Sequence, residues 1–162
     1  MTREELRKHT CCFTGHRRIP KEDLKTLKSR LRAEIVSAIE NGYIFFGAGG
    51  ALGFDTLAAQ TVLELKNQYT QVRLILVLPC VSQTKLWREQ DVSEYERNKR
   101  NADKVVYTSQ QYTYDCMKKR NRHLVDNSSL CISYLKERTG GTAYTVSYTK
   151  KHGLNIINIA LQ

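Results

Sequence analysis

The sequence has no apolar run that approaches the about 18 residues a helix needs to cross a membrane. Its first ten residues, MTREELRKHT, are too polar for a secretory signal peptide. The five cysteines, at positions 11, 12, 80, 116 and 131, have neither the CxxC nor the Cys/His spacing of a zinc site. We therefore expect a cytoplasmic protein with reduced thiols, no metal and no membrane partner.

Proline is also scarce, with two residues in 162, and no Pro/Gly/Ser-rich linker or internal repeat divides the chain. A chain of this length suggests one domain over residues 1–162, and it buries enough surface to fold without disulfides or metals. With 41% hydrophobic and 26% charged residues, the composition excludes collagen, coiled-coil and intrinsically disordered proteins.

Short apolar runs alternate with helical patterns from one end of the chain to the other. The predicted strands are 10–14, 43–46, 72–78, 104–108, 130–135 and 154–160. The predicted helices are 21–41, 54–68, 85–101, 114–128 and 142–152. The third strand, VRLILVL, is apolar on both faces, as in a parallel sheet that is covered on both sides. This alternation predicts an α/β, Rossmann-like doubly wound fold, with a mostly parallel sheet of about six strands and helices on both faces.

The chain carries 26 Lys and Arg against 16 Asp and Glu, which gives a net charge of +10. A basic surface attracts phosphates, so nucleic acid is one interpretation of this excess. The densest basic stretches, 21–32 and 118–122, lie on predicted helices, where a run of charge is usually a solvated face. Nucleic acid is therefore a less favoured partner than a small phosphorylated ligand.

Ligands of doubly wound sheets bind outside the carboxyl ends of the strands, so candidate site residues follow the predicted strands. Thr14, Gly15, His16 and Arg17 follow the first strand. The glycine there lets the backbone approach a ligand, and an arginine can grip phosphate or carboxylate with two hydrogen bonds. A plain turn with surface arginines is the alternative.

The second strand leads into a glycine-rich junction with a helix, which contains Gly47, Gly49, Gly50 and Gly53. We expect a phosphate or ribose cradle here, because free N–H groups and the helix dipole favour an anion. The GxGxxG and Walker A patterns are absent, and no Asp or Glu occurs between positions 65 and 88 to hold a ribose. An ordinary NAD oxidoreductase and a P-loop NTPase are thus disfavoured. Asp55 either caps the loop's own N–H groups or accepts hydrogen bonds from ligand hydroxyls.

Three later strand ends supply the remaining candidates. Trp87 either stacks on a base or covers the core, and Thr142 can cap the last helix and offer its hydroxyl to a phosphate. The candidates from these strand ends are Pro79, Gln83, Trp87, Arg120, Asn121, Gly140, Gly141 and Thr142.

Four motifs in order, CCFTGHR, GGALGFD, CMKKRNRHLVDNS and TGGT, resemble the YpsA-like family of the SLOG superfamily. That superfamily also includes the Lonely Guy phosphoribohydrolases and the Rossmann-like core of the DNA-processing protein A. The resemblance covers about residues 9–160. It implies a Rossmann-like fold that binds a nucleotide or a nucleotide-derived ligand, for example one derived from ADP-ribose or NAD, and it is compatible with a homo-oligomer.

The Lonely Guy enzymes cleave the N-glycosidic bond of nucleoside 5′-monophosphates. Their Met-x-x-Arg element resembles Met117 to Arg120, and their glycine-rich element resembles residues 139–145. This match places Thr145 where those enzymes carry a catalytic glutamate, and a threonine hydroxyl cannot do the work of a carboxylate. The resemblance therefore implies that the ligand-binding elements of those enzymes are retained here, whereas their catalytic glutamate is not. Asp55 is the carboxylate left to replace that glutamate.

The sequence leaves three alternative functions open. The first is binding, and sensing, of a phosphorylated nucleotide-like ligand by the two glycine-rich loops together with Arg17 and Arg120. The second is N-glycosidase activity on a nucleoside phosphate, with Asp55 as the catalytic residue. The third is binding of a single-stranded nucleic acid, against which stands the scarcity of aromatic residues among the basic ones.

Overall fold

Each of the six predicted apolar runs forms a strand in the computed structural model, which describes residues 1–160. The strands are β1 (Thr10–Gly15), β2 (Phe45–Ala48), β3 (Arg73–Leu78), β4 (Lys104–Tyr107), β5 (Leu130–Tyr134) and β6 (Asn155–Asn158). They form one sheet in the order β4-β3-β2-β1-β5-β6, and every neighbouring pair is parallel. The predicted α/β fold is confirmed, and its sheet is wholly parallel.

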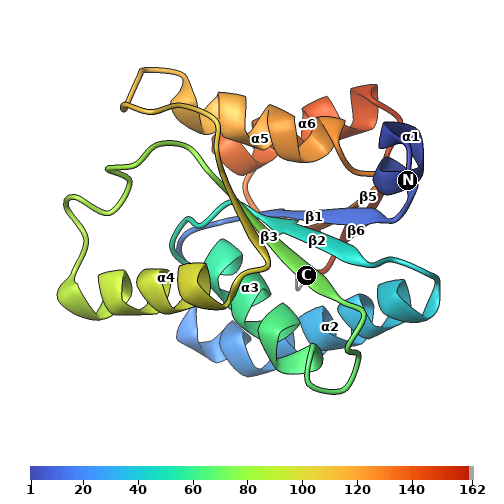
Figure 1. The fold of residues 1–162 in the computed structure, drawn as a ribbon. Helices are drawn as coiled ribbons and strands as arrows, with labels where there is room; N and C mark the ends of the chain where they lie inside the picture. The colour runs from blue at the N-terminus through green and yellow to red at the C-terminus, as the bar shows by residue number, and fades with distance from the viewer. Residues whose placement is uncertain (161–162) are drawn as a thin grey trace.

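Six helices connect and flank these strands. They are α1 (Arg3–Lys8), α2 (Lys21–Glu40), α3 (Phe54–Leu65), α4 (Glu89–Asn101), α5 (Cys116–Asp126) and α6 (Gly141–Lys151). Figure 1 shows α2, α3 and α4 on one face of the sheet and α5 and α6 on the other, so the expected covering of both faces is confirmed. Helix α4 begins four residues later than predicted, because residues 81–86 form turns instead.

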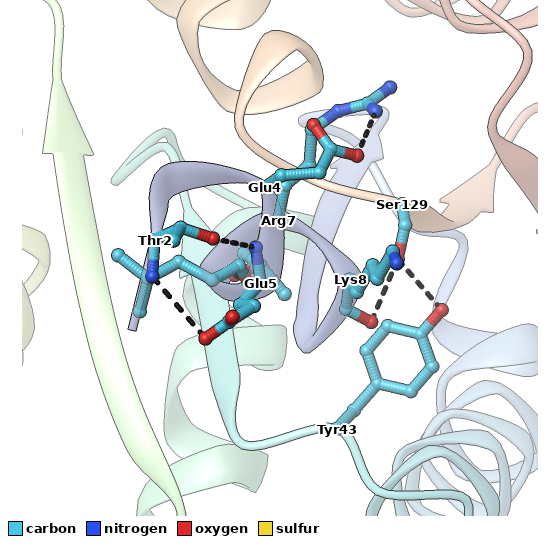
Figure 2. Close-up of polar contacts among 9 residues, drawn as sticks. Thr2, Glu4, Glu5, Arg7, Lys8, Tyr43 and Ser129 are labelled. Atoms are coloured by element: carbon cyan, nitrogen blue, oxygen red, sulfur yellow. Dashed lines mark hydrogen bonds and ion pairs between the residues drawn. The ribbon is translucent and has the colours of Figure 1, made fainter.

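The helix α1 was not predicted, although its sequence carries a start signal. The Thr2 hydroxyl accepts the Glu5 N–H at 3.1 Å, and the Glu5 carboxylate accepts the Thr2 N–H at 3.3 Å (Figure 2). This reciprocal capping box marks a helix start. Beyond the helix, Tyr43 and Ser129 share a hydrogen bond of 2.9 Å, and Ser129 donates to the carbonyl of Lys8 at 3.1 Å (Figure 2). The helix is thereby tied to the amino end of the sheet.

The larger core cluster lies between the sheet and the α2–α3 layer, and a smaller one lies between the sheet and α5. Helix α2 buries the stripe of Leu27, Leu31 and Ile35 that its spacing predicted. On the sheet side, Phe13 and Phe54 meet edge to face with ring centroids 6.4 Å apart. These contacts hold β1 and the start of α3 in fixed positions, and both segments contribute to the site described below.

The direction of the chain reverses between β1 and β5. From β1 the chain passes through α2 and continues to β2, β3 and β4 on one side, whereas β5 leads through α6 to β6 on the other. The two strands pair from Cys11 opposite Leu130 to Gly15 opposite Tyr134. Their carboxyl ends therefore form a topological switch point, where doubly wound sheets bind ligands.

No helix within residues 1–160 is both long enough and apolar enough to cross a membrane. Within the same range, no group of three His, Cys, Asp or Glu side chains is placed to hold a metal ion. All five cysteines are buried and free. Burial raises the pKa of the Cys11 thiol well above its ordinary value, which makes that thiol a poor nucleophile.

Candidate functional site

A cavity of about 270 Å³ opens at the carboxyl edge of the sheet, at the switch point between β1 and β5. Four segments line it: the end of β1 with the loop that follows, the loop before α3 with the start of that helix, the first half of α5, and the loop before α6 with the start of that helix. The lining residues are Thr14, Gly15, His16, Arg17, Ala51, Asp55, Met117, Arg120, Asn121, Thr139, Gly140, Gly141 and Thr142.

Most of the candidates from the sequence meet in this cavity, but some do not line it. The exceptions are Gly47, Gly49, Gly50, Gly53, Pro79, Gln83 and Trp87. The candidate list missed three lining residues, Ala51, Met117 and Thr139. Met117 precedes Arg120 by one helical turn, so its position was available from the helical spacing.

The glycine-rich junction serves close packing of the backbone. We had expected Gly47 in the loop after the second strand. This was wrong, because strand β2 extends to Ala48 and includes Gly47. A Cβ on Gly47 would lie 2.9 Å from a methyl group of Leu124. Gly53 has φ of +76°, and a Cβ there would collide with the backbone of Arg17. These two glycines therefore let the α5 side chains and the β1 loop approach the junction.

Gly49 lies where Arg120 and Asp55 come together. A Cβ on Gly49 would lie 2.8 Å from the Cζ of Arg120 and 2.8 Å from Oδ2 of Asp55. The guanidinium of Arg120 donates to the Gly49 carbonyl and, from Nε, to Oδ1 of Asn121 at 2.6 Å. Only 4% of the Arg120 residue is exposed. A buried cation is thus held at one wall of the cavity by backbone and side-chain acceptors.

Asp55 is also buried, with 7% of the residue exposed. Its Oδ2 accepts the N–H of Ala51 at 3.3 Å, so the capping role left open by the sequence is present. Burial raises the pKa of Asp55, while the Arg120 charge, the Ala51 N–H and the Arg17 charge act to lower it. Burial likewise lowers the pKa of Arg120, and the Asp55 carboxylate opposes this shift. The two side chains therefore stabilise each other's charged forms inside the protein.

His16 joins the loops that follow β1 and β5. Its Nε2 accepts the backbone N–H groups of Lys136 at 2.8 Å and of Glu137 at 3.2 Å. The neutral ring then carries its proton on Nδ1. Burial lowers the pKa of His16, the Glu137 charge opposes the shift, and the Lys136 charge adds to it. The neutral imidazole therefore fixes the relative position of two cavity walls.

The amino end of α6 forms the opposite wall. Gly140 precedes the helix with φ of +101°, and the space around Gly140 and Gly141 is open. No side chain caps this helix, so the capping role expected of Thr142 is wrong. Thr145 is buried; its hydroxyl donates to the Gly141 carbonyl at 2.9 Å and accepts from Asn121 at 3.0 Å. Thr145 thus links α6 to α5.

The candidates after β3 lie away from the cavity. Trp87 meets Tyr95 edge to face at 5.4 Å and packs against the core, which is the alternative that the sequence left open. Pro79 and Gln83 are buried. Gln83 lies close to Gly50, whose φ of +74° turns the loop toward β3.

Chemically, the cavity combines open N–H groups at a helix start with two guanidinium groups and one carboxylate. A helix start and arginines are suited to hold a phosphate, because both place N–H donors and positive charge on its oxygens. The Asp55 carboxylate accepts hydrogen bonds only, so it is suited to hydroxyl or amino groups of a ligand.

Comparison with known proteins gives a family match over most of the chain. The YpsA model, described as the YspA SLOG family, matches residues 12–160. The SPbeta prophage-derived protein YoqJ of Bacillus subtilis (strain 168) is 30% identical over 139 residues, which cover 77% of this chain and 81% of YoqJ.

Two solved structures share the fold. DNA processing protein A from Streptococcus pneumoniae superposes with a TM-score of 0.72 at 17% identity and covers 97% of this chain. The chain spans about half of that protein, 52% of its length. DNA processing protein A from Helicobacter pylori, described with its single-stranded DNA binding mode, gives a TM-score of 0.69 at 15% identity, over 99% of this chain and 68% of that one. At these identities the likeness establishes the fold alone.

Proposed function

This chain belongs to the YspA SLOG family, and from that membership we propose that it binds and senses a nucleotide or nucleotide-derived phosphorylated ligand in the switch-point cavity. The observation that carries the proposal is the coincidence of three features at one place. The cavity lies at the reversal of the sheet, it opens onto the uncapped start of α6, and it contains Arg17 and Arg120. Each feature alone is common, whereas together they describe a site for an anionic ligand.

The phosphate is expected at the start of α6, where the N–H groups of the first turn have no acceptor within the helix. The loop around Gly140 and Gly141 offers open space there. Arg17 lies on the neighbouring wall and is exposed, so it is free to close onto a bound phosphate. The helix start supplies a fixed dipole and Arg17 supplies an adjustable cation.

The sugar is expected near Asp55. The buried Asp55 carboxylate accepts the Ala51 N–H and can accept further hydrogen bonds, which the hydroxyl groups of a ligand would donate. The volume of about 270 Å³ is just below the range of roughly 300–1,000 Å³ that is usual for small-molecule pockets. A ligand of mononucleotide size therefore suits this cavity better than a polymer does.

Thermal unfolding with a ligand panel tests the proposal. The panel contains nucleoside monophosphates, ADP-ribose, NAD and cyclic dinucleotides. A ligand at about a hundred times its Kd should stabilise the protein by about 2.7 kcal/mol, which raises Tm by several degrees. No shift with any of them contradicts the proposal.

A matched pair of variants locates the binding. Gly141→Leu puts a side chain into open space at the start of α6, so it should block the cavity without disturbing the fold. Ser147→Leu places the same side chain at an exposed position of the same helix, outside the cavity. Gly141→Leu should abolish the ligand-induced shift and Ser147→Leu should retain it.

A second candidate function, hydrolysis of the N-glycosidic bond of a nucleoside phosphate, is favoured by one observation. Asp55 is a buried carboxylate with a raised pKa, and it lines the cavity. It is the group able to take a proton from an attacking water, while Thr145 is engaged in linking two helices. Incubation with AMP followed by chromatography should release free base, and Asp55→Asn should stop the release. Absence of free base at high protein concentration would rule this activity out.

A further inference from the structure

A second cavity, of about 530 Å³, adjoins the first on the other side of His16 and Arg17, which line both. It lies between the loop after β1 and the end of β5. Its other lining residues are Arg18, Ile19, Pro20, Tyr134, Lys136 and Glu137.

This cavity faces the start of the longest helix, α2. Pro20 is the N-cap residue, and no side chain caps the helix. The first N–H groups of α2 therefore lack an acceptor within the helix, and its dipole favours negative charge at this end. Ile19 and Pro20 bring the cavity wall directly to that helix start.

Tyr134 supplies an independent sign of a missing partner. The residue is 1% exposed, and its hydroxyl forms no hydrogen bond with any residue in the part of the chain that the structure describes. Its ring is held between His16 and Phe54, at centroid distances of 5.5 and 5.8 Å. A buried hydroxyl without a partner is costly, so a ligand oxygen in this cavity would satisfy a donor that the protein leaves unused.

The balance of charge around the cavity favours an anion. Within residues 1–160, no carboxylate lies within ion-pair distance of Arg17 or Arg18. Lys136 is paired with Asp23 at 3.1 Å, so these two charges offset each other. Glu137 is the remaining carboxylate in the lining, and its side chain is at the exposed edge. Among the lining residues, two arginines without an ion-pair partner thus stand against one carboxylate. In the first turn of α2, Glu22 is a further carboxylate, whereas Asp23 is the residue paired with Lys136.

We propose that this second cavity binds a second phosphate group of the same ligand, held by Arg18, the Tyr134 hydroxyl and the start of α2. The inference rests on the proposed function, because Arg17 then stands between two phosphate subsites. It narrows the ligand class to nucleotides that carry two separate phosphate groups, such as a nucleoside 3′,5′-bisphosphate.

Inorganic phosphate is the probe that tests the subsite without a nucleotide. In ¹⁵N-edited NMR spectra, a phosphate titration should produce saturable shifts in two sets of amides, residues 139–142 and residues 18–23. Arg18→Gln should weaken the phosphate affinity reported by residues 18–23 about tenfold, and it should leave the affinity reported by residues 139–142 unchanged. Tyr134→Phe keeps the aromatic ring and should have the same selective effect. Arg97→Gln removes an exposed arginine that lines neither cavity and serves as the control.

Calorimetry with AMP and adenosine 3′,5′-bisphosphate then tests whether one ligand uses both subsites. The bisphosphate should bind about tenfold more tightly than AMP, and Arg18→Gln should remove that difference. Equal affinity for both compounds, together with no phosphate shifts at residues 18–23, overturns the inference while the proposed function stands. Shifts at residues 18–23 with no binding of either nucleotide would instead support the subsite and contradict the proposed function.

Discussion

The Nε2 atom of His16 lies 2.8 Å from the backbone nitrogen of Lys136, across 120 positions of sequence. This hydrogen bond joins the loop after β1 to the loop after β5 at the switch point. Both loops contribute walls to the switch-point cavity, so the neutral state of one imidazole helps to hold the site together.

Stability should therefore fall in mild acid. Burial lowers the pKa of His16 from its ordinary value of 6.5, so the unfolded chain takes up a proton before the folded one does. The free energy of unfolding is then at its full value above about pH 6.5 and decreases as the pH falls toward the folded pKa. Urea unfolding between pH 8 and pH 5 measures this slope. His16→Gln retains an acceptor that does not titrate and should reduce the slope, although burial of His123 contributes a shift of the same sign. An unchanged slope in His16→Gln contradicts this role.

Arg120 and Asp55 should be energetically coupled. Arg120→Met leaves a buried carboxylate with its nearest cation removed, which should cost about 3 kcal/mol of unfolding free energy. In the Asp55→Asn background the same change should cost much less, because no charge remains to be stranded. Chemical unfolding of the wild type, both single variants and the double variant gives the coupling. Additive losses would mean that the two side chains do not stabilise each other.

Gly53 and Gly42 form a matched pair for backbone strain. Both have positive φ, +76° and +95°, but a Cβ on Gly53 collides with the Arg17 backbone whereas nothing lies within 4 Å of one on Gly42. Gly42→Ala should therefore cost about 1 kcal/mol, from the backbone conformation alone. Gly53→Ala should cost about 3 kcal/mol or more, since neither backbone segment can give way easily. Equal Tm losses would show that the junction relaxes.

The positive charge should give only weak binding to single-stranded nucleic acid. Lys118 and Lys119 are exposed on α5, and such a surface attracts an oligonucleotide by counterion release. We expect affinity for a single-stranded oligonucleotide at low salt that is lost near 0.15 M, about physiological ionic strength. Fluorescence anisotropy across a salt series measures it. Binding that persists at physiological salt would favour a nucleic-acid partner over a small ligand.

The elements of the fold could be predicted because their signals are local. Periodicity placed all six strands and five of the six helices, and the Thr2 and Glu5 capping box would have placed α1 as well. The buried stripe of α2 follows from spacing alone. The strand order could not be predicted in this way, because it depends on pairing between segments that are far apart in the sequence. Only the structure places the switch point between β1 and β5.

The site could be predicted in part for the same reason. Residues directly after β1 and before α6 line the cavity because strand ends meet at one edge. Other features of the site could not be predicted, because they depend on contacts between segments that are far apart in the sequence. His16 contacts Lys136, and a side chain at Gly53 would collide with the backbone of Arg17. Trp87 follows a strand end and could either stack on a base or cover the core, and its packing against Tyr95 confirms the core interpretation.

The proposed function places a phosphorylated nucleotide-like ligand at the start of α6, in the switch-point cavity. Isothermal titration of the ligand panel into the wild type, Gly141→Leu and Ser147→Leu tests it most directly. We expect saturable binding of at least one ligand by the wild type and Ser147→Leu, and at least a tenfold loss of affinity in Gly141→Leu. No binding by the wild type, or equal affinity in Gly141→Leu, would contradict it.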